Sequence, residues 1–162
     1  MLTSVVTKST DGIRVLSLRR EIDAFPEQGA LWSTLNAVAK RLDVVASGPP
    51  FAVHHNLGAV VGKEGKIDVE VCIPVSGPAD IAVDASMDGV QVYQLPGQSR
   101  VASITLEGSC MGLPQAYTAL FEWIKEHKEE IIGPTREIYS TMYTADPMSD
   151  EYRCEIQAPL AS

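Results

Sequence analysis

The sequence carries the string EVCIP at Glu70–Pro74 and a near copy, EIQAP, at Glu155–Pro159. In each string a glutamate precedes apolar residues and a proline closes the run, which is typical of a strand that ends at the proline. The step in residue number from Glu70 to Glu155, which we call the repeat offset, also separates Gly48-Pro49 from Gly133-Pro134. One offset shared by strands and turns predicts a tandem repeat. The alternative is that common residues recur at this spacing by chance.

Each copy is predicted to hold a strand, a helix and two further strands. The helices follow from apolar residues at helical spacing, with Leu35 and Leu120 again separated by the repeat offset, and Pro-containing turns are expected to stop both. The expected elements of the first copy are strand Ile13–Glu21, helix Glu27–Leu42 after an entry at Asp23–Pro26, strand Phe51–Asn56, turn Gly58–Gly65 and strand Ile67–Val75. Those of the second are strands Val90–Leu95 and Ser99–Glu107, broken at Pro96-Gly97, helix Leu113–Glu130, and strands Arg136–Thr141 and Tyr152–Leu160.

This element order predicts an α+β protein built from two duplicated β-α-β-β units with mainly antiparallel strands and two helices on one face or at the ends of the sheet. We expect a single domain over residues 1–162, with repeat one at about 12–76 and repeat two at about 90–162.

The charge balance bears on the class of partner. The net charge is -8, and the 13 Lys and Arg residues are spread along the chain, which argues against direct binding of nucleic acid. An acidic balance suits a cationic or neutral small ligand, although acidity that serves only solubility is an equal alternative.

Three cysteines, Cys72, Cys110 and Cys154, show no C-x-x-C spacing, so neither a disulfide framework nor a zinc site is indicated. We expect no cofactor and no metal. The N-terminal residues do not resemble a signal peptide and no apolar run would cross a bilayer, so we expect a cytoplasmic protein without a membrane partner.

The second half resembles the GyrI-like effector-binding domains, which occur alone or fused to the DNA-binding parts of multidrug-responsive MerR-type and AraC-type regulators. The first half adds the family's earlier strand pair. The strings that carry the resemblance are Pro114–Ile124 (PQAYTALFEWI), Gly133–Tyr139 (GPTREIY), Asp146-Pro147, Glu155–Leu160 (EIQAPL), Gly48–His54 (GPPFAVH) and Asp68–Val75 (DVEVCIPV).

The resemblance implies a curved antiparallel sheet around a central cleft that binds lipophilic, often cationic or aromatic compounds through acidic and aromatic residues. It also implies that some relatives hydrolyse strained cyclopropane-bearing toxins. The chain departs from the family where a His-x-Gly-Pro-Tyr string is usual and Leu106-Glu107-Gly108-Ser109-Cys110 stands instead. It carries no helix-turn-helix pattern, so it is similar to the stand-alone members.

Glu137 is the foremost candidate for the ligand site. Glu137 and Tyr139 lie two apart in a strand and therefore share a face, and a hairpin of the last two strands would let Glu137 approach Glu155. A carboxylate among Tyr117, Phe121, Trp123 and Tyr139 would attract a cation, with cation–π contacts of about 0.5–2 kcal/mol. The alternative is a surface ion pair of Glu137 with Arg136 or Arg153.

Glu70 and His54 complete the candidate set, Glu70 as the repeat counterpart of Glu155. A solvent-facing strand position is the alternative for both glutamates. His54 and His55 are adjacent and point to opposite faces, and His127 is expected to be solvated. Trp32 and Trp123 lie on the predicted helices, where a role in the core is favoured over a role as a ligand platform. Because the counterpart of Glu137 is Ala52, we expect the ligand nearer the second copy.

Two functions fit these residues. The first is a binding module that senses or sequesters a lipophilic, cationic or aromatic small molecule. The second is a hydrolase of strained electrophilic toxins, in which Glu137 or Glu155 activates water or donates a proton at a raised pKa. A role as a partner of a separate regulator or other protein stays open, as does a homodimer.

Overall fold

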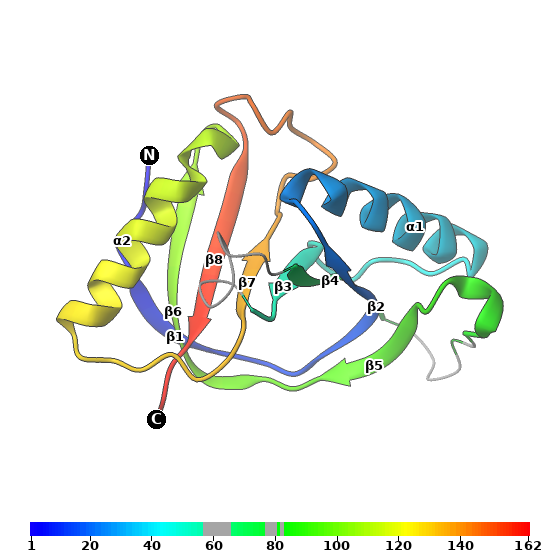
Figure 1. Ribbon diagram of the computed structural model, residues 1–162, viewed down its shortest axis with the longest axis horizontal. Helices are drawn as coiled ribbons and strands as arrows, with labels where there is room; N and C mark the ends of the chain where they lie inside the picture. The colour runs from blue at the N-terminus through cyan, green and yellow to red at the C-terminus, as the bar shows by residue number, and fades with distance from the viewer. Residues whose placement is uncertain (57–65, 77–80, 82) are drawn as a thin grey trace. The chain divides into compact units, whose positions relative to one another are not determined.

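The computed structural model describes residues 1–56, 66–76, 81 and 83–162, and Figure 1 labels its helices and strands along the chain. The predicted turn Gly58–Gly65 lies outside the described residues. The chain divides into two compact units: unit 1 comprises Met1–Asp11 and Gly97–Ser162, and unit 2 comprises Gly12–Pro96.

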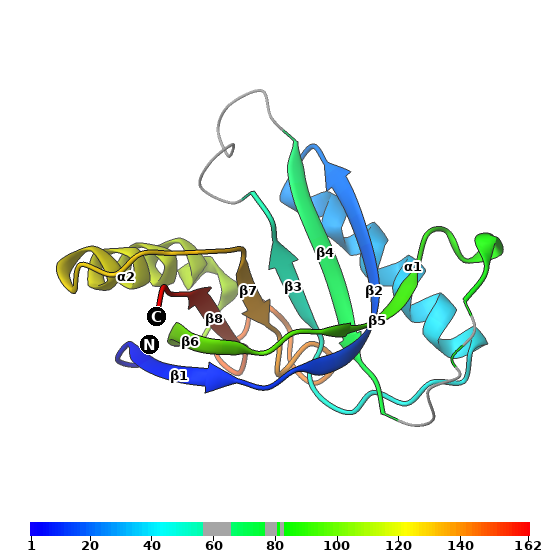
Figure 2. The same cartoon turned by 90° about the horizontal axis from the view of Figure 1, so that it is seen from below.

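Unit 2 is a four-stranded antiparallel sheet with one helix. Its strands are β2 (Ile13–Ile22), β3 (Phe51–His54), β4 (Ile67–Pro74) and β5 (Gln91–Leu95), joined in the order β3-β4-β2-β5; Figure 2 shows β4 between β3 and β2. A 3-10 turn, η1 (Phe25–Glu27), leads into helix α1 (Gln28–Arg41), and η2 (Ala85–Met87) precedes β5. The Glu27 carboxylate accepts the backbone N–H groups of Asp23 and Ala24, both at 2.7 Å, which fixes the predicted helix entry.

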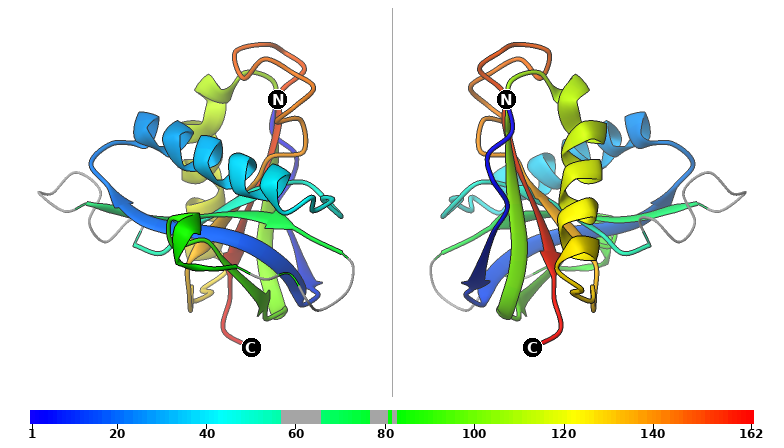
Figure 3. Two further views of the ribbon diagram at one scale, coloured as in Figure 1. Left: turned by 90° about the vertical axis from the view of Figure 1, so that its right-hand side faces the viewer. Right: turned by 90° about the vertical axis from the view of Figure 1, so that its left-hand side faces the viewer.

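Unit 1 repeats this design. Its strands are β1 (Val6–Thr10), β6 (Gln98–Glu107), β7 (Thr135–Ile138) and β8 (Arg153–Pro159), paired antiparallel in the order β1-β6-β8-β7. The 3-10 turn η3 (Cys110–Gly112) leads into helix α2 (Leu113–Glu126), which lies along the sheet in the right-hand view of Figure 3. The predicted α+β class with antiparallel strands and two helices is therefore confirmed.

The repeat offset extends to whole elements. It relates β1 to β5, β2 to β6, η1 to η3 and α1 to α2 at both ends of each element, and it relates the final residues of β4 and β8. The strand Val90–Leu95 was predicted as part of the second half, but β5 pairs with β2 of unit 2, while β1, which was not predicted, pairs with β6 of unit 1. In each unit, the strand at the edge of the sheet therefore comes from outside the β-α-β-β segment that forms the rest of the unit.

Helix α1 ends at Arg41, one residue before its predicted end, and both helices end before the prolines that were expected to stop them. The residues two positions beyond α1 and α2, Asp43 and Lys128, have φ angles of 55° and 54°, a left-handed conformation that ends a helix by redirecting the chain. Helix α2 was predicted to reach Glu130 and ends at Glu126. The turns at Gly48-Pro49 and Gly133-Pro134 therefore follow the helix ends rather than cause them.

Each helix packs its apolar stripe on one face of its own sheet. In unit 2, Leu31, Leu35 and Val38 of α1 are buried with Leu16 and Leu18 of β2, and α1 crosses this sheet in the left-hand view of Figure 3. In unit 1, Ala116, Leu120 and Ile124 of α2 are buried with Ile104, Leu106 and Ile156. In the described part of the chain, no helix has the length and apolar character needed to cross a membrane.

Candidate ligand-binding site

Glu137 lies in β7 and is buried, with only 8% of its surface exposed. Its Oε1 accepts a hydrogen bond of 2.9 Å from the Tyr139 hydroxyl, and its Oε2 accepts one from the hydroxyl of Tyr117 on α2. The Phe121 ring lies one helical turn further along α2, with its centroid 5.8 Å from that of Tyr117. The structure thus brings together four predicted site residues, which we call the Glu137 cluster: Tyr117, Phe121, Glu137 and Tyr139.

The Glu137 cluster lies on the helix-covered face of the unit 1 sheet. In the β7–β8 register Glu137 is opposite Ile156, and Ile156 is opposite Ile104 of β6, so the three side chains share a face. Burial raises the pKa of Tyr117 well above its ordinary value, and the nearby Glu137 carboxylate raises it further. Tyr117 therefore stays a neutral hydrogen-bond donor to Glu137. Because Glu137 is buried, the alternative of an ion pair at the surface does not hold.

The expected approach of Glu155 to Glu137 is wrong. Glu155 is opposite Ile138, the residue after Glu137, and neighbouring residues of a strand point to opposite faces. Glu155 therefore lies on the face of the sheet away from α2. Any mechanism that needs both carboxylates at one bond loses its geometric basis.

Glu155 is half-buried, and polar side chains of unit 1 surround it. Its Oε2 lies 2.7 Å from Nζ of Lys8 on β1, 2.8 Å from Oγ of Ser103 on β6 and 2.7 Å from Nε2 of Gln157. Burial alone would raise the pKa of Glu155, but the hydrogen bonds from Lys8, Gln157 and Ser103 outweigh burial and lower it. Glu155 is therefore ionised and paired with a lysine of its own unit.

Glu70 occupies the corresponding position in unit 2 and is only 5% exposed. Its Oε1 lies 2.9 Å from Nε2 of His55, and its Oε2 accepts a hydrogen bond from the Tyr93 hydroxyl. Burial would raise the pKa of Glu70, but hydrogen bonds from His55, Tyr93 and Ser17 together lower it. The carboxylate contributes to the wall of a cavity of about 440 Å³, which we call the Glu70 pocket.

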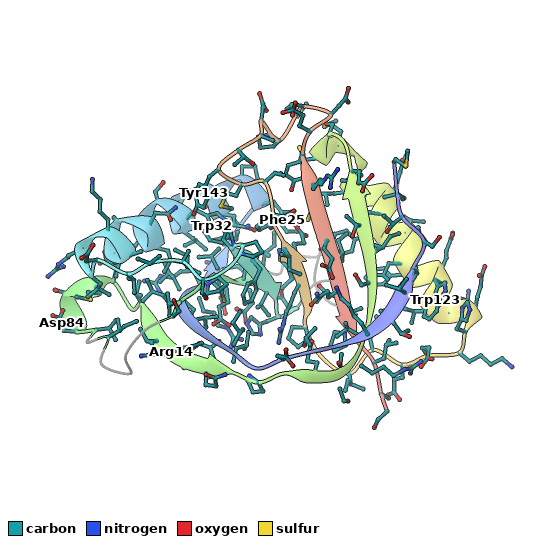
Figure 4. All side chains as sticks on the ribbon, turned by 180° about the vertical axis from the view of Figure 1, so that it is seen from behind. Arg14, Phe25, Trp32, Asp84, Trp123 and Tyr143 are labelled. Carbon is teal, nitrogen blue, oxygen red and sulfur yellow. The ribbon has the colours of Figure 1, made fainter. Side chains whose placement is uncertain are left out.

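The other predicted residues lie apart from these carboxylates. His54 is buried with its ring 5.9 Å from that of Phe25 in η1, and its neighbour His55 contacts Glu70, so the two histidines diverge as predicted. Trp123 stacks on His127 with ring centroids 4.0 Å apart, near the C-terminal end of α2; Figure 4 labels Trp123 there and Trp32 on α1. Trp32 is buried, and Trp123 is occupied by its contact with His127.

Sequence reasoning missed the partners of the two strand glutamates. Tyr93 and Lys8 are separated by the repeat offset, like Glu155 and Glu70. The same offset could therefore have identified Tyr93 and Lys8 as equivalent positions. This equivalence could not be recognised, because β1 was not predicted and β5 was assigned to the second half of the chain. Among the described residues, no group of three or more His, Cys, Asp or Glu side chains is arranged to hold a metal ion.

A family model described as the GyrI-like small molecule binding domain matches residues 4–161, and the chain belongs to this family. No curated protein matches the chain.

Solved structures support the same fold. The C-terminal domain of EcmrR is 20% identical, with a TM-score of 0.81, and the match covers 98% of both chains. The chain spans 57% of the EcmrR chain in a complex with DNA, at 19% identity and the same TM-score. SAV2435 bound to tetraphenylphosphonium is 14% identical, with a TM-score of 0.65 over 99% of this chain and 95% of that one, and a hydrolase encoded by lin2189 from Listeria innocua is 11% identical, with a TM-score of 0.69 over 98% and 92%. At these identities the likeness is one of fold.

Proposed function

We propose that the chain binds a lipophilic, cationic or aromatic small molecule at the Glu137 cluster, and acts as an effector sensor or a sequestering module. The observation that carries the proposal is a buried carboxylate that accepts the hydroxyls of Tyr117 and Tyr139, with the Phe121 ring packed against that of Tyr117. A carboxylate supplies the charge that a cation seeks, and aromatic faces add about 0.5–2 kcal/mol each through cation–π contact. Such a site favours charge and apolar surface over detailed shape.

The burial of Glu137 sets a condition on this binding. Because Glu137 is 8% exposed and accepts two tyrosine hydroxyls, a ligand that pairs with its carboxylate has to displace groups that now contact it. This displacement costs free energy, and the observed affinity is lower by that amount. A large aromatic cation meets this condition best, since it buries its own apolar surface in return.

The solved structures lend two kinds of support. SAV2435, which is similar in fold, is described as bound to tetraphenylphosphonium, a lipophilic aromatic cation. The EcmrR domain that matches this chain is one part of a longer DNA-bound protein, which is consistent with an effector-sensing module. We further propose a cytoplasmic location, action through a separate regulator or protein partner, and a tandem duplication within one domain, in which β1 belongs to the first copy as β5 belongs to the second.

Isothermal titration of the chain with tetraphenylphosphonium tests the proposal. We expect one saturable site and a loss of affinity of about tenfold or more in Glu137→Gln, which keeps the shape of the side chain but removes its charge. Triphenylphosphine oxide is a neutral control with three of the same rings and should bind much more weakly. Glu122→Gln removes a carboxylate from the exposed side of α2 and should bind like the wild type. Equal affinity of the wild type and Glu137→Gln for tetraphenylphosphonium would overturn the proposal.

A hydrolase is the second candidate, because two of the similar structures, both from Listeria innocua, are described as hydrolases. The version with two catalytic glutamates is not supported, since Glu137 and Glu155 lie on opposite faces. A version with Glu137 alone predicts that a strained cyclopropane substrate gains one water, detected by mass spectrometry, and that Glu137→Gln abolishes the gain. Absence of turnover by the wild type would reject this candidate and leave the binding function intact.

A further inference from the structure

The Glu70 pocket and the surroundings of Glu155 are two versions of one site. Glu70 and Glu155 lie at the same place in β4 and β8, and Tyr93 and Lys8 lie at the same place in the edge strands β5 and β1. A serine of the neighbouring strand contacts each glutamate, Ser17 in unit 2 and Ser103 in unit 1. The two sites therefore differ in the residue that the edge strand supplies.

In unit 1 the edge strand supplies a cation. Nζ of Lys8 lies 2.7 Å from Oε2 of Glu155, so a primary ammonium ion at the end of an alkyl chain neutralises this carboxylate. In unit 2 the edge strand supplies the uncharged Tyr93, whose hydroxyl donates to Glu70. The carboxylate of Glu70 is more deeply buried than that of Glu155, with side-chain exposures of 6% and 23%, yet its edge-strand partner carries no charge.

The unit 2 site also has room for a ligand. The cavity of about 440 Å³ is lined by Glu70 and Tyr93 together with Ser17 and Gln91, and by two arginines. Arg19 is neutralised by Asp68 through two hydrogen bonds of 2.9 and 2.7 Å, and Arg20 donates to the backbone carbonyls of Arg19 and Asp88. The lining is polar, in contrast to the rings of the Glu137 cluster, which points to a hydrophilic ligand.

We propose that the Glu70 pocket is a second binding site, separate from the Glu137 cluster, for a small hydrophilic primary amine whose ammonium group pairs with Glu70 as Lys8 pairs with Glu155. An ionised carboxylate offers about four acceptor positions, and His55, Tyr93 and Ser17 use three of them. The fourth accepts the ammonium group. The inference goes beyond the proposed function and does not depend on it, because residues and ligand differ.

Thermal denaturation with n-butylammonium chloride, which copies the lysine side chain beyond its Cα, tests this proposal. At concentrations several times the dissociation constant we expect the melting temperature of the wild type to rise by about 2–4 °C, relative to sodium chloride of equal ionic strength and to 1-butanol. Glu70→Gln should show no rise, and Glu122→Gln, which removes an exposed carboxylate of α2, should respond like the wild type. A flat wild-type response, or an equal rise in Glu70→Gln, would overturn the proposal.

Two further variants test the correspondence between the sites. Tyr93→Lys should place a lysine of the chain against Glu70 and abolish the response to n-butylammonium. Lys8→Ala should leave Glu155 open and give a larger response than the wild type, which the added change Glu155→Gln reverses. Lys125→Ala, which removes an exposed lysine of α2, is the matched control for Lys8→Ala. A normal response in a folded Tyr93→Lys protein would contradict the assignment, and if Tyr93→Lys does not fold, Tyr93→Arg carries the same test.

Discussion

Tyr117→Phe isolates the energetic role of the Glu137 cluster. The change removes one hydroxyl and keeps the ring, so the packing against Phe121 is preserved while the Glu137 carboxylate loses one of its two tyrosine donors. A hydrogen bond to a charged group contributes about 1.5–3 kcal/mol. Glu137 is 8% exposed, so water cannot readily replace the lost donor. We therefore expect the free energy of unfolding to fall by about 1.5–3 kcal/mol.

Urea unfolding followed by circular dichroism measures this loss, and the melting temperature should fall by roughly 2–4 °C for each kcal/mol in a protein of this length. The companion background is Glu137→Leu, in which the Tyr117 hydroxyl has lost this acceptor. There, Tyr117→Phe should cost much less than in the wild-type background, because the hydroxyl that it removes has already lost its carboxylate acceptor. A loss below about 0.5 kcal/mol in the wild-type background, or the same loss in both backgrounds, would refute this account of the cluster.

Three other features of the structure give predictions of their own. The hydrogen bonds from Lys8, Gln157 and Ser103 lower the pKa of Glu155 against the effect of burial, so its stabilising contribution is present above the unfolded pKa of about 4.3 and is lost as the pH falls through the folded pKa. Urea midpoints of the wild type should exceed those of Glu155→Gln at pH 6, and the difference should shrink as the pH is lowered below the unfolded pKa. Leu120→Ala removes a fully buried side chain of α2 and should cost about 2–5 kcal/mol, whereas Leu120→Met should cost under about 1.5 kcal/mol by the same urea measurement. Gly112→Ala would bring its Cβ to 2.8 Å from Cδ1 of the buried Leu106 and should destabilise the protein by about 1–2 kcal/mol. Gly29→Ala, whose Cβ would have nothing within 4 Å, should stabilise it by about 0.5–1 kcal/mol. Calorimetric melting curves that rank the two variants in the opposite order would contradict the packing at Leu106.

Local patterns predicted most of the secondary structure because the signals were local. A short stretch of consecutive residues is enough to predict the apolar stripes of α1 and α2 and the strands β4 and β8, which end at a proline. The strand β1 was missed because VTKST is polar and largely exposed and shows no alternation of apolar and polar residues. The placement of β5 was wrong because strand pairing is a long-range choice, and Pro96-Gly97 marks the break between β5 and β6 without saying which partner each strand takes.

In the candidate site, too, features that depend on local sequence were predicted and features that depend on strand pairing were not. Glu137 and Tyr139 on one face follow from the two-residue period of a strand, and Tyr117 with Phe121 follows from the helical spacing. The separation of Glu137 from Glu155 depends on the β7–β8 register, and a shift of one residue would have placed the two glutamates on the same face. That register is set by the folded connection between the two strands, which no local pattern in residues 139–152 specifies.

The most direct measurement of the central claim is the set of intermolecular nuclear Overhauser effects between the phenyl protons of bound tetraphenylphosphonium and the side chains of the chain. Binding at the Glu137 cluster predicts contacts with the ring protons of Tyr117, Tyr139 and Phe121, together with a change in the chemical shift of the Glu137 carboxylate carbon. Contacts confined to residues outside this cluster, with the Glu137 carboxylate carbon unmoved at saturation, would contradict the account.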